Sequence, residues 1–305
     1  MAIRLIGIDV DGTLLDTEGR LPAANRDAIY EAVAAGIHVA LVTGRSYPFA
    51  RPVAEALPPA ITLIVSNGAV ERSMNGDVLA RRLLDRSVAR DVLASTRAYR
   101  DAAALIFDRD DGRQVIFESM DWEHPGRKNY WQRNQRLIAQ AVPLEEALVE
   151  DPIQVMFNGA VDVMRVLAED LRNAARSARH SGPTSHRWLV GSRSDATFRE
   201  TARREARGFA VSLTEYVHRD FSLIDITAPE ATKGRALAWR AAQLALTRDE
   251  VMAIGDNFND LEMLQYAGTP VVMANAVEGL KGYGWHITGH QNEAGLAQAI
   301  RRFAL

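Results

Sequence analysis

Near its N-terminus the chain alternates between mostly apolar runs and amphipathic stretches. Residues 3–8, 37–42 and 61–65 are the apolar runs, which are typical of strands buried on both faces of a sheet. Residues 25–35 carry apolar side chains at helical spacing, and residues 48–57 predict a second helix. This alternation of strand and helix predicts a doubly wound parallel sheet.

The pattern changes after Gly68. Residues 70–79, with Asn75-Gly76 between two short segments, predict a hairpin. Residues 122–134 are polar and aromatic with weak periodicity, and no element is predicted there. The other segments predict short strands mixed with helices, which is typical of an open α+β module. The strands are expected at residues 105–107, 114–117, 153–157, 188–190 and 221–226, and the helices at residues 86–100, 161–178 and 198–207.

The strand and helix alternation then returns. Helices are predicted at residues 232–246, 261–266 and 293–303, and strands at residues 251–254 and 270–273. We therefore expect an α/β protein whose core is formed by residues 1–82 and 228–305, with an α+β domain at residues 83–227 inserted between the two halves. In doubly wound sheets, ligands bind at the carboxyl ends of the strands near the switch in strand order.

The composition excludes several kinds of chemistry. The chain has 305 residues, of which 47% are hydrophobic and 25% charged, and its formal net charge is −3. Without cysteine it has no disulfide, zinc–thiolate site or thiol nucleophile. The small net charge gives no case for a nucleic-acid or membrane partner. Because the N-terminal apolar run is short and no run reaches the roughly 18 apolar residues of a membrane span, we expect a cytoplasmic location.

Two carboxylates follow the first predicted strand, as Asp9 and Asp11, and Gly12 and Thr13 come directly after them. Neighbouring carboxylates at the end of a buried strand are costly, because burial and mutual repulsion both disfavour their charge. A divalent cation such as Mg²⁺ would relieve both problems. Gly12 would allow a tight turn and a close backbone approach by a ligand. The alternative is a strand that ends in a solvated Asp-rich turn.

A second acidic segment, Gly255-Asp256-Asn257-Phe258-Asn259-Asp260, follows the predicted strand at residues 251–254. If the two strands are neighbours, Asp256 and Asp260 join Asp9 and Asp11 in a cluster of four carboxylates, which favours a metal site. The alternative is an N-terminal capping turn of the next helix. Neither segment has the spacing of an EF-hand loop, and zincin and Walker A patterns are absent from the sequence.

Two further segments offer groups that suit a phosphate. Thr43-Gly44-Arg45 ends a predicted strand, and its hydroxyl and glycine amide suit a phosphoryl oxygen, although a strand-to-helix cap is the simpler interpretation. Lys233-Gly234 opens a predicted helix. A lysine there could neutralise both a phosphate and a nucleophilic carboxylate, although an ordinary surface lysine is the alternative.

Taken together and in this order, these motifs resemble the haloacid dehalogenase (HAD) superfamily, and within it the Cof-type phosphatases of subclass IIB. The resemblance covers residues 1–82 and 228–305, whereas residues 83–227 match only in position and approximate size. It implies a Rossmann-like core with an inserted cap domain that sets substrate specificity. It also implies a small phosphorylated molecule as substrate. We expect a monomer or weak homodimer.

The resemblance further implies an aspartyl-phosphate mechanism, in which Asp9 is the nucleophile and Asp11 is first the general acid and then the base. Mg²⁺ would be held by Asp9, Asp256 and the backbone carbonyl of Asp11, and Asp260 would hold metal-bound water or orient Lys233. The groups implied to bind the phosphoryl group are Thr43, Gly44, Lys233, Asn259 and the amide of Gly12.

Two other functions use the same residues. A phosphotransferase or mutase would pass the phosphoryl group to a sugar, and it would be activated by a bisphosphate without accumulating free phosphate. A non-catalytic sensor would bind a phosphometabolite without turnover, but loss of Asp11 would be the simplest route to such a protein, and Asp11 is present.

The inserted segment has two features that suggest binding. Trp122, Tyr130 and Trp131 could stack on a sugar or base, although packing or an oligomer contact is the more ordinary interpretation. Its arginines could contact nucleic acid, but acidic residues interleave with them, and solvated helix faces are favoured. These arginines are Arg172, Arg176, Arg179, Arg193, Arg199, Arg203, Arg204 and Arg207.

Overall fold

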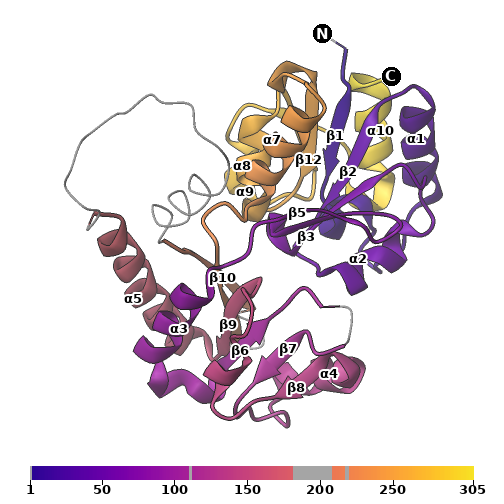
Figure 1. Cartoon of the computed structure of the whole chain (residues 1–305). Helices are drawn as coiled ribbons and strands as arrows, with labels where there is room; N and C mark the ends of the chain where they lie inside the picture. The colour runs from indigo at the N-terminus through magenta and orange to yellow at the C-terminus, as the bar shows by residue number, and fades with distance from the viewer. Residues whose placement is uncertain (1, 110–111, 181–207, 217–219) are drawn as a thin grey trace. The chain divides into compact units, whose positions relative to one another are not determined.

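The structure is a computed structural model that describes residues 2–109, 112–180, 208–216 and 220–305 (Figure 1). The chain divides into two compact units. The first is formed by Met1–Arg82 together with Glu230–Leu305, and the second by Leu83–Pro229. The strand predicted at residues 188–190 and the helix predicted at residues 198–207 lie outside the described residues.

The first unit contains one mixed sheet. In spatial order, its described strands are β14 (His286–Ile287), β13 (Thr269–Val272), β12 (Val251–Gly255), β1 (Leu5–Ile8), β2 (His38–Val42), β3 (Thr62–Val65), β4 (Val70–Ser73) and β5 (Val78–Arg81). The strands from β14 to β3 are parallel, and β4 and β5 continue the sheet as an antiparallel hairpin. From β1 the chain continues to β2 and β3 on one side, and it returns later to β12 and β13 on the other. The switch in strand order therefore lies at β1.

Helices cover both faces of this sheet, as expected for a doubly wound fold. The helices of the first unit are α1 (Ala23–Ala34), α2 (Tyr47–Ala54), α7 (Lys233–Gln243), α8 (Leu261–Tyr266), α9 (Glu278–Lys281) and α10 (Gly295–Phe303). Helices α7 and α8 pack together on one side, and α1 and α10 pack together on the other (Figure 1). Leu5 and Val42 of the sheet and Leu237 of α7 belong to one buried core. The α/β fold class predicted from the sequence is confirmed.

The second unit is an α+β module with its own sheet and core. In spatial order, its described strands are β10 (Ala210–Tyr216), β11 (Phe221–Thr227), β9 (Gln154–Gly159), β6 (Ala103–Ile106), β7 (Val115–Phe117) and β8 (Ile138–Gln140). Among these described strands, only β7 and β8 pair in parallel. Helix α5 (Val161–His180) packs on β9, β10 and β11, and helix α3 (Arg86–Ser95) contacts β9. Phe107, Phe157 and Ile224 are among the side chains buried between them.

Among the described strands and α-helices of the second unit, β8, β10 and helix α4 (Pro125–Asn134) were not predicted. Helix α4 begins at Pro125, after His124, whose ring nitrogen accepts a hydrogen bond from the backbone of Gly126. Trp122 stacks on Trp131 of this helix with ring centroids 4.9 Å apart. These two aromatic side chains therefore pack against each other, as the more ordinary interpretation expects.

One of the arginines of the inserted segment, Arg176 of α5, lies on a solvated helix face. Arg176 is exposed and hydrogen-bonds Glu169 and Asn173 of the same helix. Arg193, Arg199, Arg203, Arg204 and Arg207 lie outside the described residues. Within the part of the chain that the structure covers, no helix is long and apolar enough to cross a membrane.

Candidate active site

The two acidic segments meet because β1 and β12 are parallel neighbours. Ile8 pairs in register with Ile254, so both strands end at the same edge of the sheet. Asp9 follows β1 directly, and its backbone N–H donates to the carbonyl of Ile254 at 3.0 Å. Asp256 follows β12 directly. The sheet thus places these two carboxylates side by side.

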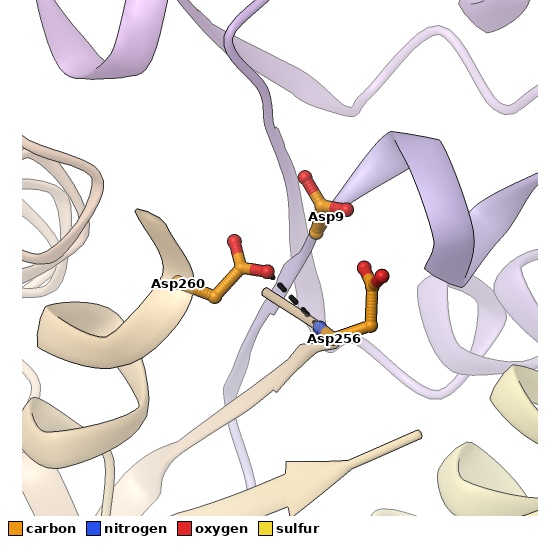
Figure 2. A group of neighbouring side chains, drawn as sticks. All are labelled: Asp9, Asp256 and Asp260. Atoms are coloured by element: carbon orange, nitrogen blue, oxygen red, sulfur yellow. Dashed lines mark hydrogen bonds between the residues drawn. The ribbon is translucent and has the colours of Figure 1, made fainter. Parts of the chain in front are cut away.

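Three carboxylates converge at this edge (Figure 2). Asp9, Asp256 and Asp260 each offer one oxygen atom, and these atoms lie within 4.8 Å of one another. Asp260 is fully buried, and its Oδ2 accepts hydrogen bonds from the backbone N–H groups of Asp256 and Asn257 at 3.0 and 3.1 Å. The segment therefore forms the capping turn considered above and also supplies carboxylates to the cluster.

Lys233 is the cation of this cluster. Its Nζ lies 2.6 Å from Oδ1 of Asp9 and 2.7 Å from Oδ1 of Asp260, and only 1% of its side chain is exposed. Helix α7 starts at Lys233 after the N-cap Thr232, whose side chain accepts a hydrogen bond from the backbone of Arg235. The alternative of an ordinary surface lysine is thereby excluded.

The electrostatics of the cluster favour a divalent cation. Burial, followed by repulsion from Asp260, raises the pKa of Asp9 well above its usual range, and Lys233 only partly offsets this. The same two causes raise the pKa of Asp256 to about 6. Burial works to lower the pKa of Lys233, but Asp9 and Asp260 raise it overall. Because one ammonium cannot balance three carboxylates, the oxygen donors fit a hard cation such as Mg²⁺.

The turn after Asp9 is shaped by close contact with Asp256. Gly12 has a φ of +88°, and a side chain there would collide with the Asp256 carboxylate. Thr13 donates a hydrogen bond from Oγ1 to Oδ1 of Asp256 at 3.2 Å. Asn275, which the sequence did not single out, donates from Nδ2 to the carbonyl of Gly12 at 2.8 Å. No motif surrounds Asn275, so only its position after β13 could have indicated it.

The side chain of Asp11 does not join the cluster. It is exposed, and its two oxygens accept hydrogen bonds from Arg45: Nε donates to Oδ2 at 2.8 Å and Nη2 donates to Oδ1 at 2.6 Å. The expected group of four carboxylate side chains therefore contains three. The physical reason is that the guanidinium offers Asp11 a closely fitting partner of opposite charge.

The other predicted residues lie around the same edge. Because β2 is the second parallel neighbour of β1, Thr43 and Gly44 emerge beside Asp9. Thr43 is buried, and its Oγ1 accepts a hydrogen bond from the backbone N–H of Arg45 at 3.1 Å, so the hydroxyl also caps the turn. Asn259 is exposed on the short helical turn Phe258–Asp260, next to Asp260.

Comparison with known proteins identifies the family of the chain. The sequence model of the haloacid dehalogenase-like hydrolases matches residues 6–188 and 189–300. The chain is 27% identical to the 5-amino-6-(5-phospho-D-ribitylamino)uracil phosphatase YcsE of Bacillus subtilis, over 99% of this chain and 96% of that protein. It is 26% identical to the pyridoxal phosphate phosphatase YbhA of Escherichia coli, over 98% of each.

Among solved structures, the fold is similar to that of a HAD subclass IIB sugar phosphatase, with a TM-score of 0.66, 18% identity and coverage of 98% of each chain. Since the family model spans nearly the whole sequence, the chain belongs to the haloacid dehalogenase-like hydrolases.

Proposed function

We propose that this phosphatase hydrolyses phosphomonoesters of small organic molecules through a phosphoryl group carried transiently on Asp9. The observation that carries the proposal is the contact of Lys233 with Asp9 inside the buried carboxylate cluster. A nucleophilic carboxylate must stay ionised beside an anionic substrate, and an ammonium 2.6 Å from its Oδ1 favours the ionised form.

Mg²⁺ is the proposed cofactor. Asp9, Asp256 and the backbone carbonyl of Asp11 would hold the ion, and Asp260 would orient Lys233 or hold water on the ion. When bound, Mg²⁺ would offset the repulsion between Asp9 and a dianionic phosphate. The fit rests on the oxygen donors of the cluster and on the negative charge that Lys233 leaves unbalanced.

The reaction has two steps. In the first, an Asp9 oxygen bonds to phosphorus as the bond from phosphorus to the leaving oxygen breaks, and Asp11, which begins this step as a neutral carboxylic acid, gives that oxygen its proton. In the second, Asp11 takes a proton from a water molecule whose oxygen bonds to phosphorus, and the bond from phosphorus to Asp9 breaks. Free phosphate leaves, Asp9 is again a carboxylate, and Asp11 is again a carboxylic acid. The groups proposed to bind the phosphoryl oxygens are Thr43, Gly44, Lys233, Asn259 and the amide of Gly12.

The substrate is proposed to be a small phosphorylated metabolite, and the unit Leu83–Pro229 is proposed to select it as a cap domain. Relatives named for a phosphoribityl-aminouracil, pyridoxal phosphate and a sugar phosphate support this range. No nucleic-acid or membrane partner is proposed. The chain is proposed to act as a monomer or weak homodimer.

Phosphate release tests this proposal. It would be measured on p-nitrophenyl phosphate and a panel of metabolite phosphates, with Mg²⁺ and with EDTA. We expect release that needs Mg²⁺, that Asp9→Asn abolishes, and that Asp249→Asn, at an exposed position of the same unit, leaves unchanged. If the folded wild-type protein releases no phosphate from any compound, the hydrolase proposal is wrong. Activation by a bisphosphate without phosphate accumulation would identify a mutase instead.

A further inference from the structure

Arg45 and Asp11 form a two-armed ion pair at the edge of the cluster. Nε and Nη2 of Arg45 lie 2.8 and 2.6 Å from the two oxygens of Asp11, so both carboxylate oxygens are held at once. Such a fork fixes the plane of a carboxylate as well as its position. The pair joins the ends of β1 and β2, which are parallel neighbours in the sheet.

The backbone and side chain of Arg45 are anchored separately. Its N–H donates to Oγ1 of Thr43 at 3.1 Å, and its carbonyl accepts from the N–H of Ser66 at 2.9 Å. The remaining arm of the guanidinium, Nη1, donates to the carbonyl of Phe49 at 3.4 Å. Because these contacts come from the ends of β2 and β3 and from α2, the guanidinium has a defined place relative to the strand ends.

This arrangement separates the two carboxylates of the first motif. Asp9 is buried against Lys233, whereas 61% of the Asp11 side chain is exposed and its charge is matched by Arg45. Among the described residues, Arg45 is the charged partner of Asp11. Without it, a cation bound by the cluster two residues away would attract the Asp11 carboxylate. An acid that transfers protons must face the leaving group instead of that cation.

We propose that Arg45 is a positioning residue, which holds the Asp11 carboxylate outside the cation site and oriented for proton transfer to the leaving oxygen. This inference rests on the proposed function. A direct role, in which the Arg45 guanidinium binds the phosphoryl group, predicts a different result, because loss of Arg45 would then slow the hydrolysis of every phosphomonoester alike. If Arg45 is a positioning residue, its loss slows most strongly the hydrolysis of substrates whose leaving oxygen needs a proton.

The test compares an aryl with an alkyl phosphate. p-Nitrophenolate departs without a proton, whereas the alkoxide of glycerol phosphate needs one, so kcat/KM would be measured for both in Arg45→Ala. We expect kcat/KM for the alkyl ester to fall at least about tenfold further than for the aryl ester, since positioned acids contribute roughly 10² or more. Arg45→Lys keeps the charge without the fork and should recover part of that loss. Arg51→Ala, at an exposed position of α2, is the matched control and should change neither value.

The double variant that combines Arg45→Ala with Asp11→Asn gives a second, independent readout. If Arg45 acts through Asp11, Arg45→Ala has little further effect on alkyl-ester hydrolysis once Asp11→Asn is present. The inference is overturned if Arg45→Ala lowers kcat/KM equally for both esters, or if the effects of Arg45→Ala and Asp11→Asn on kcat/KM multiply in the double variant. If the wild-type protein hydrolyses neither ester, the proposed function fails first, and that result differs from an equal loss in an active enzyme.

Discussion

The Nζ atom of Lys233 lies 2.6 Å from Oδ1 of Asp9, although the two residues are 224 positions apart in the sequence. Both side chains are buried, and the same ammonium also contacts Asp260 at 2.7 Å. The contact joins the start of α7 to the end of β1 and places a positive charge on the proposed nucleophile. It therefore bears on both the stability and the activity of the protein.

Lys233→Met should lower both the stability and the activity of the protein. The substitution leaves two buried carboxylates without their cation, and breaking a buried ion pair in this way typically costs about 3–5 kcal/mol. Thermal unfolding in EDTA would measure this loss, and phosphate release would be expected to disappear. Lys281→Met is the control, because Lys281 pairs with the exposed Glu278, and such pairs contribute less than about 1 kcal/mol. Equal melting temperatures for the two variants would contradict the role given to Lys233.

Adding Mg²⁺ should stabilise the wild-type protein against heat. An ion that binds only the folded state at one hundred times its dissociation constant adds about 2.7 kcal/mol to the free energy of unfolding. Asp256→Asn removes one proposed ligand and should reduce this gain, and calorimetry with and without Mg²⁺ would measure both effects. A full Mg²⁺ response in Asp256→Asn would mean that the ion binds elsewhere.

Substituting Gly12 tests the shape of the turn after Asp9. Gly12→Ala places a methyl group against the Asp256 carboxylate at a φ of +88°, so it should abolish phosphate release. Gly19 is a matched control, since it also has a positive φ, of +75°, but nothing within 4 Å of the added carbon. Gly19→Ala should cost only about 1–2 kcal/mol of backbone strain and keep the activity. If both variants behave alike, strain alone explains the effect.

The stability of the protein should depend on pH through Asp225, a residue of the second unit. Burial raises its pKa to about 6, and a hydrogen bond from Gln154 only partly offsets this. The folded protein therefore holds this proton more tightly than the unfolded chain, whose Asp pKa is about 4. The free energy of unfolding should fall, by on the order of 2 kcal/mol, as pH rises from about 4 through 6.

Asp225→Asn removes this titration. Urea unfolding at pH 4.5 and 7.5 should show that the variant gains stability relative to the wild-type protein at the higher pH. A difference between the two proteins that does not change with pH would contradict the raised pKa.

The convergence of the acidic segments was predictable because it depends on backbone topology. Apolar runs before Asp9 and Asp256 predicted parallel strands, and parallel neighbours end at one edge of the sheet. The sequence alone left open whether Lys233 was an ordinary surface side chain, and only the family resemblance placed it at the site. Its burial depends on where α7 starts, after the N-cap Thr232.

The features that escaped prediction depend on side-chain contacts between distant segments. The pairing of Asp11 with Arg45 spans 34 residues and is one of two plausible orientations for that carboxylate, toward the cluster or away from it. The sequence of helix α4 has weak helical periodicity, so the pattern did not predict it. Contacts such as the stacking of Trp131 on Trp122 hold the helix in place. Such tertiary contacts outweigh the local sequence pattern, and no sequence motif predicts them.

The most direct test of the account is the detection of a phosphoryl group on Asp9. The protein would be mixed with substrate and Mg²⁺, quenched in acid within the first turnovers, and analysed by intact mass and peptide mapping. We predict one phosphoryl group per chain on the peptide that contains Asp9, more of it in Asp11→Asn, and none in Asp9→Asn. If an active protein carries no phosphoryl group at any quench time, or carries it on another residue, the central claim is wrong.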